Sequence, residues 1–151
     1  MTRTLVDGAY VVTMDADRTE HTTGHVLVEG EAIEVVAAGA APSDVREGAD
    51  RVVDGSGCLL TPGLVNTHHH LYQWATRGLA VDATLFDWLT GLYPVWAGID
   101  ERAVDVAARG ALAGLARSGC TTSSDHHYVF PRAGGDVFAA EVEAARTVGI
   151  R

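Results

Sequence analysis

Five of the seven histidines in this chain fall into two clusters. The first cluster spans residues 68–70 in the stretch TPGLVNTHHHLYQ, and the second spans residues 126–127, directly after Asp125. Along an extended chain, side chains at positions i and i+2 point the same way, so His68 and His70 should project together. Two neutral imidazoles side by side suit Zn²⁺ or Fe²⁺, which readily bind nitrogen donors. The spacing therefore predicts a site for one divalent metal ion.

Each histidine cluster follows a short stretch that has the composition of a β-strand. The stretch LVNT (64–67) reads as a short buried strand, and CTTSSD (120–125) is rich in β-branched residues. The carboxyl ends of parallel strands open on one face of an α/β protein, where sites are built. We therefore expect the two clusters to meet in one pocket, although they lie far apart in the sequence.

The segments between and after these strands predict helices. Residues 85–96 are aromatic and helix-like, and Pro94 is expected to break that helix. Residues 101–117 form a clear helix with Asp100 as its cap and Gly119 as its stop. A second helix over 136–148 places three apolar residues on one face: Phe138, Val142 and Ala145.

The order strand, helix, strand, helix is that of a parallel α/β sheet or barrel. An eight-stranded barrel needs about 250 residues. The fold class expected for residues 61–151 is therefore α/β, the first βα units of a parallel sheet or of a truncated (β/α)8 TIM-type barrel. On this interpretation the chain is the N-terminal fragment of a longer protein.

Residues 1–60 predict a small β-sandwich-like domain. The β-branched stretches 9–14, 24–30, 32–38 and 51–60 read as strands, with a tight turn at 29–31. The polar stretch 41–50 reads as a turn region. The expected domains are thus a small β-domain over 1–60 and the start of an α/β barrel over 61–151.

Composition restricts the class of protein further. The chain is 47% hydrophobic and 21% charged, the balance of a globular protein. Its net charge of −9 argues against nucleic-acid binding, because no basic patch exists to neutralise phosphates. No apolar run predicts a membrane span or a signal peptide, so we expect no membrane partner. Two distant cysteines give no disulfide framework, and a cytoplasmic location is expected.

The stretch TPGLVNTHHH resembles the first-strand signature of the amidohydrolase superfamily, in which a Pro-Gly-apolar-apolar-Asp/Asn-x-His-x-His run carries two metal ligands. The preceding β-rich segment resembles the small composite β-domain of these enzymes, and GCTTSSDHHYVFP resembles their second strand. The stretches NTHHHLYQWATRGL, LFDWLTGLYPVW and SDHHY are similar to the 8-oxoguanine deaminase and hydroxy-triazine aminohydrolase branch.

The resemblance implies roles for particular residues. It makes His68 and His70 ligands of a single divalent metal, with Zn²⁺ expected and Fe²⁺ as the alternative. It places Gln73 at a position that binds the heterocycle. The remaining histidines are left open between substrate contact and packing: His69, His126 and His127. Tyr72 and Trp74 suit a pocket wall or core, and Arg77 suits a structural salt bridge.

The activity that the resemblance implies is hydrolytic deamination of a small aminated heterocycle like 8-oxoguanine. Other amidohydrolase chemistry stays open as an alternative, namely triazine dechlorination or cyclic amide hydrolysis. A non-catalytic metal-binding fragment is a further alternative, and a homo-oligomer of the full-length protein also stays open. The family completes its metal site with a His after the fifth strand and an Asp after the eighth. Its catalytic residues are therefore expected beyond residue 151.

The sequence predicts that the 151-residue chain is inactive by itself. Two imidazoles are fewer than the three protein ligands of a catalytic zinc site. Purified chain of this length should release no ammonia from aminated heterocycles. Normal deaminase turnover with bound metal would contradict this expectation.

Overall fold

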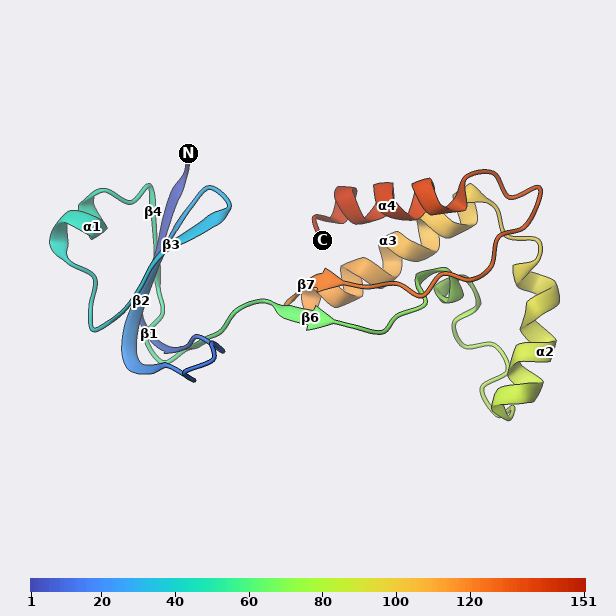
Figure 1. Cartoon of the computed structure of the whole chain (residues 1–151), viewed down its shortest axis with the longest axis horizontal. Helices are drawn as coiled ribbons and strands as arrows, with labels where there is room; N and C mark the ends of the chain where they lie inside the picture. The colour runs from blue at the N-terminus through green and yellow to red at the C-terminus, as the bar shows by residue number, and fades with distance from the viewer. The chain divides into compact units, whose positions relative to one another are not determined.

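The computed structural model describes all 151 residues, and they form two compact units, Met1–Pro62 and Gly63–Arg151. The first unit is mainly β-sheet, and the second packs helices around two short parallel strands (Figure 1). None of the helices is both long and apolar enough to span a bilayer. The elements are β1 (Arg3–Val12), β2 (Glu20–Glu29), β3 (Ala32–Ala38), α1 (Ser43–Glu47), β4 (Arg51–Asp54), β5 (Leu59–Leu60), β6 (Leu64–Asn66), the 3₁₀ helix η1 (Leu71–Thr76), α2 (Leu85–Trp96), α3 (Glu101–Arg117), β7 (Cys120–Ser123) and α4 (Val137–Val148).

The first unit contains one five-stranded mixed sheet. Its order is β3-β2-β1-β4, and β5 also pairs with β1. Strand β1 alternates in burial, with Leu5, Ala9 and Val11 buried, as a half-buried strand requires. Gly30 turns β2 into β3 with a φ of 60°, at the turn expected for residues 29–31. The strands thus share a single sheet, and no second sheet packs on it within this unit.

The stretch expected to be a turn region, residues 41–50, contains the short helix α1. The Asp7 carboxylate on β1 accepts a hydrogen bond from the Ala41 N–H at 2.9 Å and pairs with the Arg46 guanidinium at 2.6 Å. Asp7 is 9% exposed, so its charge needs these partners. This contact across the fold favours a helix that local composition does not predict.

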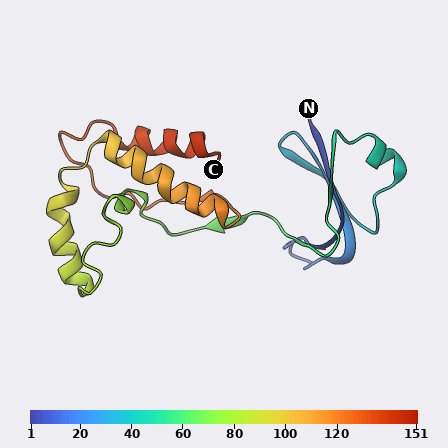
Figure 2. The ribbon, with the colours of Figure 1, turned by 180° about the vertical axis from the view of Figure 1, so that it is seen from behind.

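In the second unit, strands β6 and β7 pair in parallel, and α3 and α4 lie side by side next to them (Figures 1 and 2). Both strands form where the sequence predicts them. The prediction that the first is buried is wrong, because Leu64 is 56% exposed and Val65 is 63% exposed. Strand β6 pairs only with β7 in a two-stranded sheet, so its apolar side chains lack a covering layer.

Pro94 lies inside α2 and does not end it, contrary to the sequence expectation. A proline in the last turn removes one backbone hydrogen bond, the one to the Thr90 carbonyl. The buried Trp96 side chain secures that turn, because its indole N–H donates to the Thr76 hydroxyl at 3.0 Å. Tertiary packing therefore extends the helix past the proline.

Helix α3 has the predicted bounds and cap. The Asp100 side chain accepts from the Ala103 N–H at 2.8 Å, and Gly119 follows the helix with a φ of 87°. Helix α4 also forms, but Phe138 on its predicted apolar face is 61% exposed. The residues of α4 that are buried are Val137, Glu141 and Ala144. This face includes a carboxylate, so apolar periodicity does not identify it.

Gly63 allows the close approach of the two parallel strands. A Cβ at this position would lie 2.3 Å from side-chain atoms of Thr121, well inside van der Waals contact. The glycine of the Pro62-Gly63 pair is therefore required by packing next to β7.

We predict that Gly63→Ala lowers the free energy of unfolding by about 1–3 kcal/mol, the usual cost of overpacking. Gly91→Ala is the matched control, because a Cβ at Gly91 in α2 meets nothing within 4 Å. That control should stabilise the protein by up to about 1 kcal/mol, since alanine favours a helix over glycine. Urea unfolding measures both, and equal effects of the two substitutions would contradict the packing role.

Candidate functional site

The His68 and His70 side chains come together at the carboxyl end of β6. Their Nε2 atoms lie 3.2 Å apart, and the two rings meet edge to face with an interplanar angle of 85°. Two nitrogens at about 2.0–2.1 Å from a tetrahedral zinc ion lie roughly 3.3 Å apart. The donor pair predicted from the i, i+2 spacing thus has the separation that a shared metal ion requires.

The orientation of the His70 ring leaves its Nε2 atom free to bind a metal. Its Nδ1 atom lies 2.8 Å from the His126 carbonyl oxygen, which can only accept a hydrogen bond. Nδ1 therefore donates, and Nε2 keeps its lone pair. A backbone carbonyl on the far nitrogen is the usual support of a metal-binding histidine.

The second histidine cluster lies against the first. The His126 N–H donates to the His69 carbonyl at 2.8 Å, and the Leu71 N–H donates to the Asp125 carboxylate at 2.7 Å. The His126 ring stacks on His68 with 4.5 Å between ring centroids. The prediction that parallel strands would bring the two clusters together is thus confirmed.

The His69 ring takes no part in the close contact between the two donor atoms, as the alternation along an extended chain predicts. Its Nδ1 atom accepts a hydrogen bond from the His70 N–H at 2.9 Å, and its ring lies 6.5 Å from that of Trp74. Burial lowers the pKa of His69 below its ordinary value, and the neighbouring Asp125 charge opposes that shift. A neutral His69 ring therefore lies beside the donor pair.

Gln73 is held by two phenols. Its side-chain nitrogen donates to the Tyr128 hydroxyl at 2.9 Å and to the Tyr72 hydroxyl at 3.2 Å. Burial strongly raises the pKa of Tyr72, so its hydroxyl stays neutral. The Tyr128 ring also meets the His70 ring edge to face at 5.3 Å. Sequence reasoning missed Tyr128, because only its position after the second histidine cluster could have indicated it.

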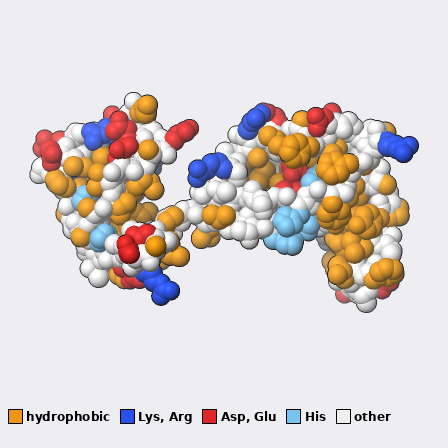
Figure 3. Space-filling model, viewed as in Figure 1, with side chains coloured by type: hydrophobic (Ala, Val, Ile, Leu, Met, Phe, Trp, Pro, Cys, Tyr) orange, Lys and Arg blue, Asp and Glu red, His pale blue; other side chains and the backbone are white.

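A cavity of about 690 Å³ opens beside this group. The donor pair, Gln73, Trp74, Arg77 and Trp88 contribute to its wall. Figure 3 shows the histidine side chains of this unit gathered in one patch, on a face where α2 also exposes apolar side chains. The expectation that Arg77 forms a structural salt bridge is wrong. Its guanidinium pairs with no carboxylate and lies 4.5 Å from the Trp74 ring centroid.

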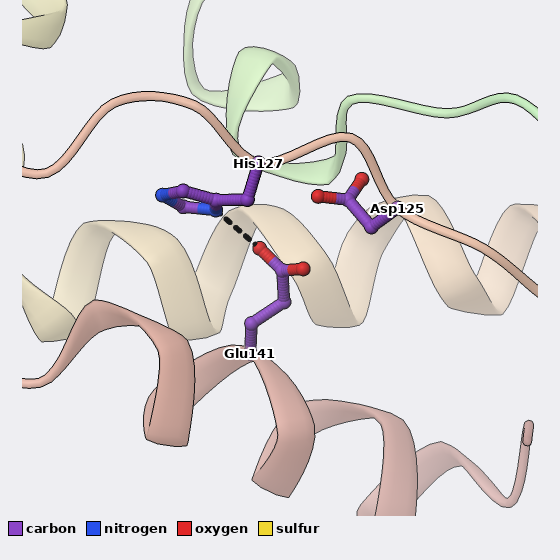
Figure 4. Close-up of side chains that lie close together, drawn as sticks. All are labelled: Asp125, His127 and Glu141. Atoms are coloured by element: carbon purple, nitrogen blue, oxygen red, sulfur yellow. Dashed lines mark hydrogen bonds and ion pairs between the residues drawn. The ribbon is translucent and has the colours of Figure 1, made fainter.

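His127 offers no free nitrogen to a substrate, which favours packing over substrate contact, the two alternatives left open for it. Its Nδ1 atom lies 2.7 Å from a Glu141 carboxyl oxygen, and its Nε2 atom lies 2.8 Å from the Val129 carbonyl oxygen. The His127 and Glu141 side chains are only 5% and 9% exposed. Figure 4 shows the two side chains facing each other. Glu141 was missed because it lies on the buried face of a helix, where a carboxylate has no local signature.

The buried position of Glu141 changes its titration. Burial is the main cause that raises its pKa to about 7, and the neighbouring Asp125 carboxylate raises it further. The hydrogen bond with His127 acts in the opposite direction. The second Asp125 oxygen, Oδ2, is buried and has no hydrogen-bond partner. A protonated Glu141 could therefore donate to it.

Two parallel strands, each followed by a histidine cluster and with helices packed beside them, have the arrangement of the first βα units of a barrel. The model of the amidohydrolase family matches residues 59–151, more than half of the chain. The chain belongs to the amidohydrolase family.

Two curated relatives support this assignment. The 8-oxoguanine deaminase of Pseudomonas aeruginosa is 45% identical over 123 residues, which is 80% of this chain and 26% of the relative. The hydroxydechloroatrazine ethylaminohydrolase of Pseudomonas sp. (strain ADP) is 39% identical over 111 residues, which is 70% of this chain and 23% of the relative. The chain thus spans about a quarter of the length of these relatives.

Solved structures of the family share the fold. Atrazine chlorohydrolase from Arthrobacter aurescens TC1, complexed with zinc, matches with a TM-score of 0.85 and 30% identity. An adenosine deaminase from Xanthomonas campestris with bound zinc matches with a TM-score of 0.83 and 25% identity. These matches cover 98% and 99% of this chain, and 34% and 33% of the solved chains. The expected α/β fold, the N-terminal part of an amidohydrolase barrel protein, is confirmed.

We predict that Glu141→Gln removes a pH dependence of stability. Because the pKa of Glu141 is raised in the folded state, its protonated form stabilises the fold below about pH 4.5, and this contribution is lost as pH rises through about 7. As pH rises from about 4.5 to about 7, the free energy of unfolding of the unmodified protein should fall relative to that of Glu141→Gln.

Urea unfolding at a series of pH values measures this difference. The exposed Glu143 on the same helix provides the control, and Glu143→Gln should follow the unmodified protein at each pH. Parallel stability curves for Glu141→Gln and the unmodified protein would contradict the raised pKa.

Proposed function

We propose that the intact protein containing this chain is a metal-dependent aminohydrolase that removes an exocyclic amino group from a small heterocycle like 8-oxoguanine. The observation that carries the proposal is the 3.2 Å approach of the His68 and His70 Nε2 atoms at the end of β6. The His126 carbonyl oxygen, which accepts a hydrogen bond from His70 Nδ1, supports the proposal. This hydrogen bond leaves the Nε2 atom of His70 available to the ion.

The substrate class rests on the relatives. Their names are 8-oxoguanine deaminase, isoxanthopterin deaminase and hydroxydechloroatrazine ethylaminohydrolase. The isoxanthopterin deaminase is 41% identical over 130 residues. Names of this kind favour hydrolytic deamination of a planar nitrogen heterocycle. Because this chain spans only a quarter of those proteins, the reaction is proposed for the intact protein.

His68 and His70 would hold the metal ion, with Zn²⁺ proposed and Fe²⁺ as the alternative. A metal ion bound in such a site supplies a water of lowered pKa as the nucleophile. A catalytic zinc has three protein ligands and an open position. We propose that further ligands and the proton-transferring residues come from parts of the intact protein outside this chain.

Residues of this chain would bind and orient the ring. The Gln73 side-chain nitrogen is occupied by two phenols, so its carbonyl oxygen remains to accept from a ring N–H. Trp74 and Trp88 line the cavity and suit a flat ring by stacking. His69 and His126 lie beside the donor pair and are proposed to contact the substrate.

A second reaction is favoured by one observation. A solved chlorohydrolase that acts on atrazine matches this chain with a TM-score of 0.85. Triazine dechlorination is therefore the alternative reaction, and cyclic amide hydrolysis is a further one. A non-catalytic metal-binding fragment is the alternative of another class. Metal stoichiometry separates it, because an amidohydrolase of this kind takes about one ion tightly and a metal buffer takes several weakly.

The intact protein should release ammonia from 8-oxoguanine faster than from guanine, cytosine or a hydroxy-triazine. His68→Ala and His70→Ala should each lower the metal content below one ion and reduce activity by more than about 100-fold, beyond the loss typical of outer-shell partners. Ammonia release and metal analysis measure these effects.

The matched control is His21→Ala, because His21 lies on β2 in the first unit. It should retain both the metal and the activity. Chloride release from a chlorotriazine without ammonia release from any amino heterocycle would favour the alternative reaction. Full metal content in both ligand variants would refute the proposed site.

A further inference from the structure

We infer that the buried cluster Asp125–His127–Glu141 is a positioning device for the metal ligand His70. The cluster fixes the segment in which the His126 carbonyl oxygen accepts a hydrogen bond from His70 Nδ1. The inference rests on the proposed role of His70 in the metal site. None of the three cluster residues needs to touch the metal or the substrate.

The cluster ties a loop to a helix inside the second unit. Asp125 and His127 follow β7, and Glu141 projects from α4 to meet them (Figure 4). The His127 Nε2 atom faces a backbone carbonyl, so it must donate there, and a proton lies between Nδ1 and the Glu141 carboxyl. His127 is therefore fixed at both ring nitrogens.

Asp125 connects this anchor to the segment that follows His70. One carboxyl oxygen accepts from the Leu71 N–H at 2.7 Å. The other, Oδ2, is buried and has no hydrogen-bond partner. Figure 4 shows the Asp125 carboxyl group next to Glu141. A second proton, on the other oxygen of Glu141, would satisfy it, and the pKa of Glu141, raised by burial and by Asp125, favours that proton. With that proton in place, the hydrogen bonds would run from α4 through Asp125 to residue 71.

The distances favour a proton in this cluster and a metal at the histidine pair. The three side chains offer ligand atoms within 4.8 Å of one another, a grouping that could suggest a second metal site. However, the Nδ1 and carboxyl oxygen of His127 and Glu141 are 2.7 Å apart, shorter than the roughly 3.3 Å between two ligands of a tetrahedral zinc. His68 and His70, by contrast, have the metal-compatible separation.

The position of His126 follows from its two neighbours. With Asp125 bonded to Leu71 and His127 bonded to α4, the peptide between them is fixed on both sides. Its N–H then meets the His69 carbonyl, and its carbonyl oxygen meets the His70 ring. Loss of the anchor should free this carbonyl and allow the His70 ring to turn or to change its tautomer.

The test measures metal affinity of the intact protein by competition with a chelator, using Zn²⁺ and no substrate. Glu141→Ala should weaken Zn²⁺ binding about 10–100-fold, the range for lost support of a metal-binding histidine. Glu141→Gln should stay within about threefold of the unmodified protein, because an amide bonds to His127 and also donates to Asp125. Glu143→Ala on the exposed face of α4 is the control and should have no effect.

A second measurement, of the nitrogen at which His70 is protonated, tests the inference if Glu141→Ala does not fold. In histidine-labelled intact protein, ¹⁵N resonances should show His70 protonated at Nδ1 both without and with Zn²⁺. Protonation of His70 at Nε2 in the metal-free protein would overturn the inference. So would unchanged Zn²⁺ affinity in a folded Glu141→Ala variant.

These outcomes are separable from those of the proposed function. A protein that binds Zn²⁺ tightly but releases no ammonia would refute the deaminase proposal. The affinity ratio between Glu141→Ala and Glu141→Gln would still test the positioning role.

Discussion

The parallel pairing of β6 and β7 is the constraint on which the site depends. The two strands are joined through η1, α2 and α3, and their pairing sets one histidine cluster against the other in register. Hydrogen bonds continue beyond the strands, from Ser124 to Asn66 and from His126 to His69. Gly63 permits this pairing because no side chain separates the strands at their start. The geometry of the proposed metal site is thus a consequence of strand register.

Behind this edge, the second unit buries polar groups where a simpler core would be apolar. Glu141 and His127 cost free energy to desolvate, and the cost is offset only because each has a hydrogen-bond partner. Such a pair fixes one arrangement of α4 against the loop, since a displaced helix would leave a buried carboxyl group unpaired. An apolar contact would tolerate more slippage. The buried His127–Glu141 pair therefore fixes the orientation of α4 against the loop that follows β7.

Aromatic packing joins the core to the cavity. Tyr72 and Trp96 are fully buried and meet edge to face at 5.5 Å, and Trp88 meets Trp96 at 5.0 Å. The hydroxyl of Tyr72 reaches Gln73, whose amide also contacts Tyr128. The orientation of the proposed substrate-binding amide is therefore set by side chains that belong mainly to the core.

Sequence alone determined the features that depend on local spacing. The i, i+2 histidine pair, the Asp100 cap and the strand–helix order follow from side-chain periodicity and backbone capping, which act over a few residues. Tertiary structure decided the rest: the polar face of α4 with Glu141, the full occupation of the His127 ring and the continuation of α2 past Pro94. These features depend on hydrogen-bond partners and burial contributed by residues distant in the chain. No local pattern encodes such partners, because they meet only when the strands and helices pack.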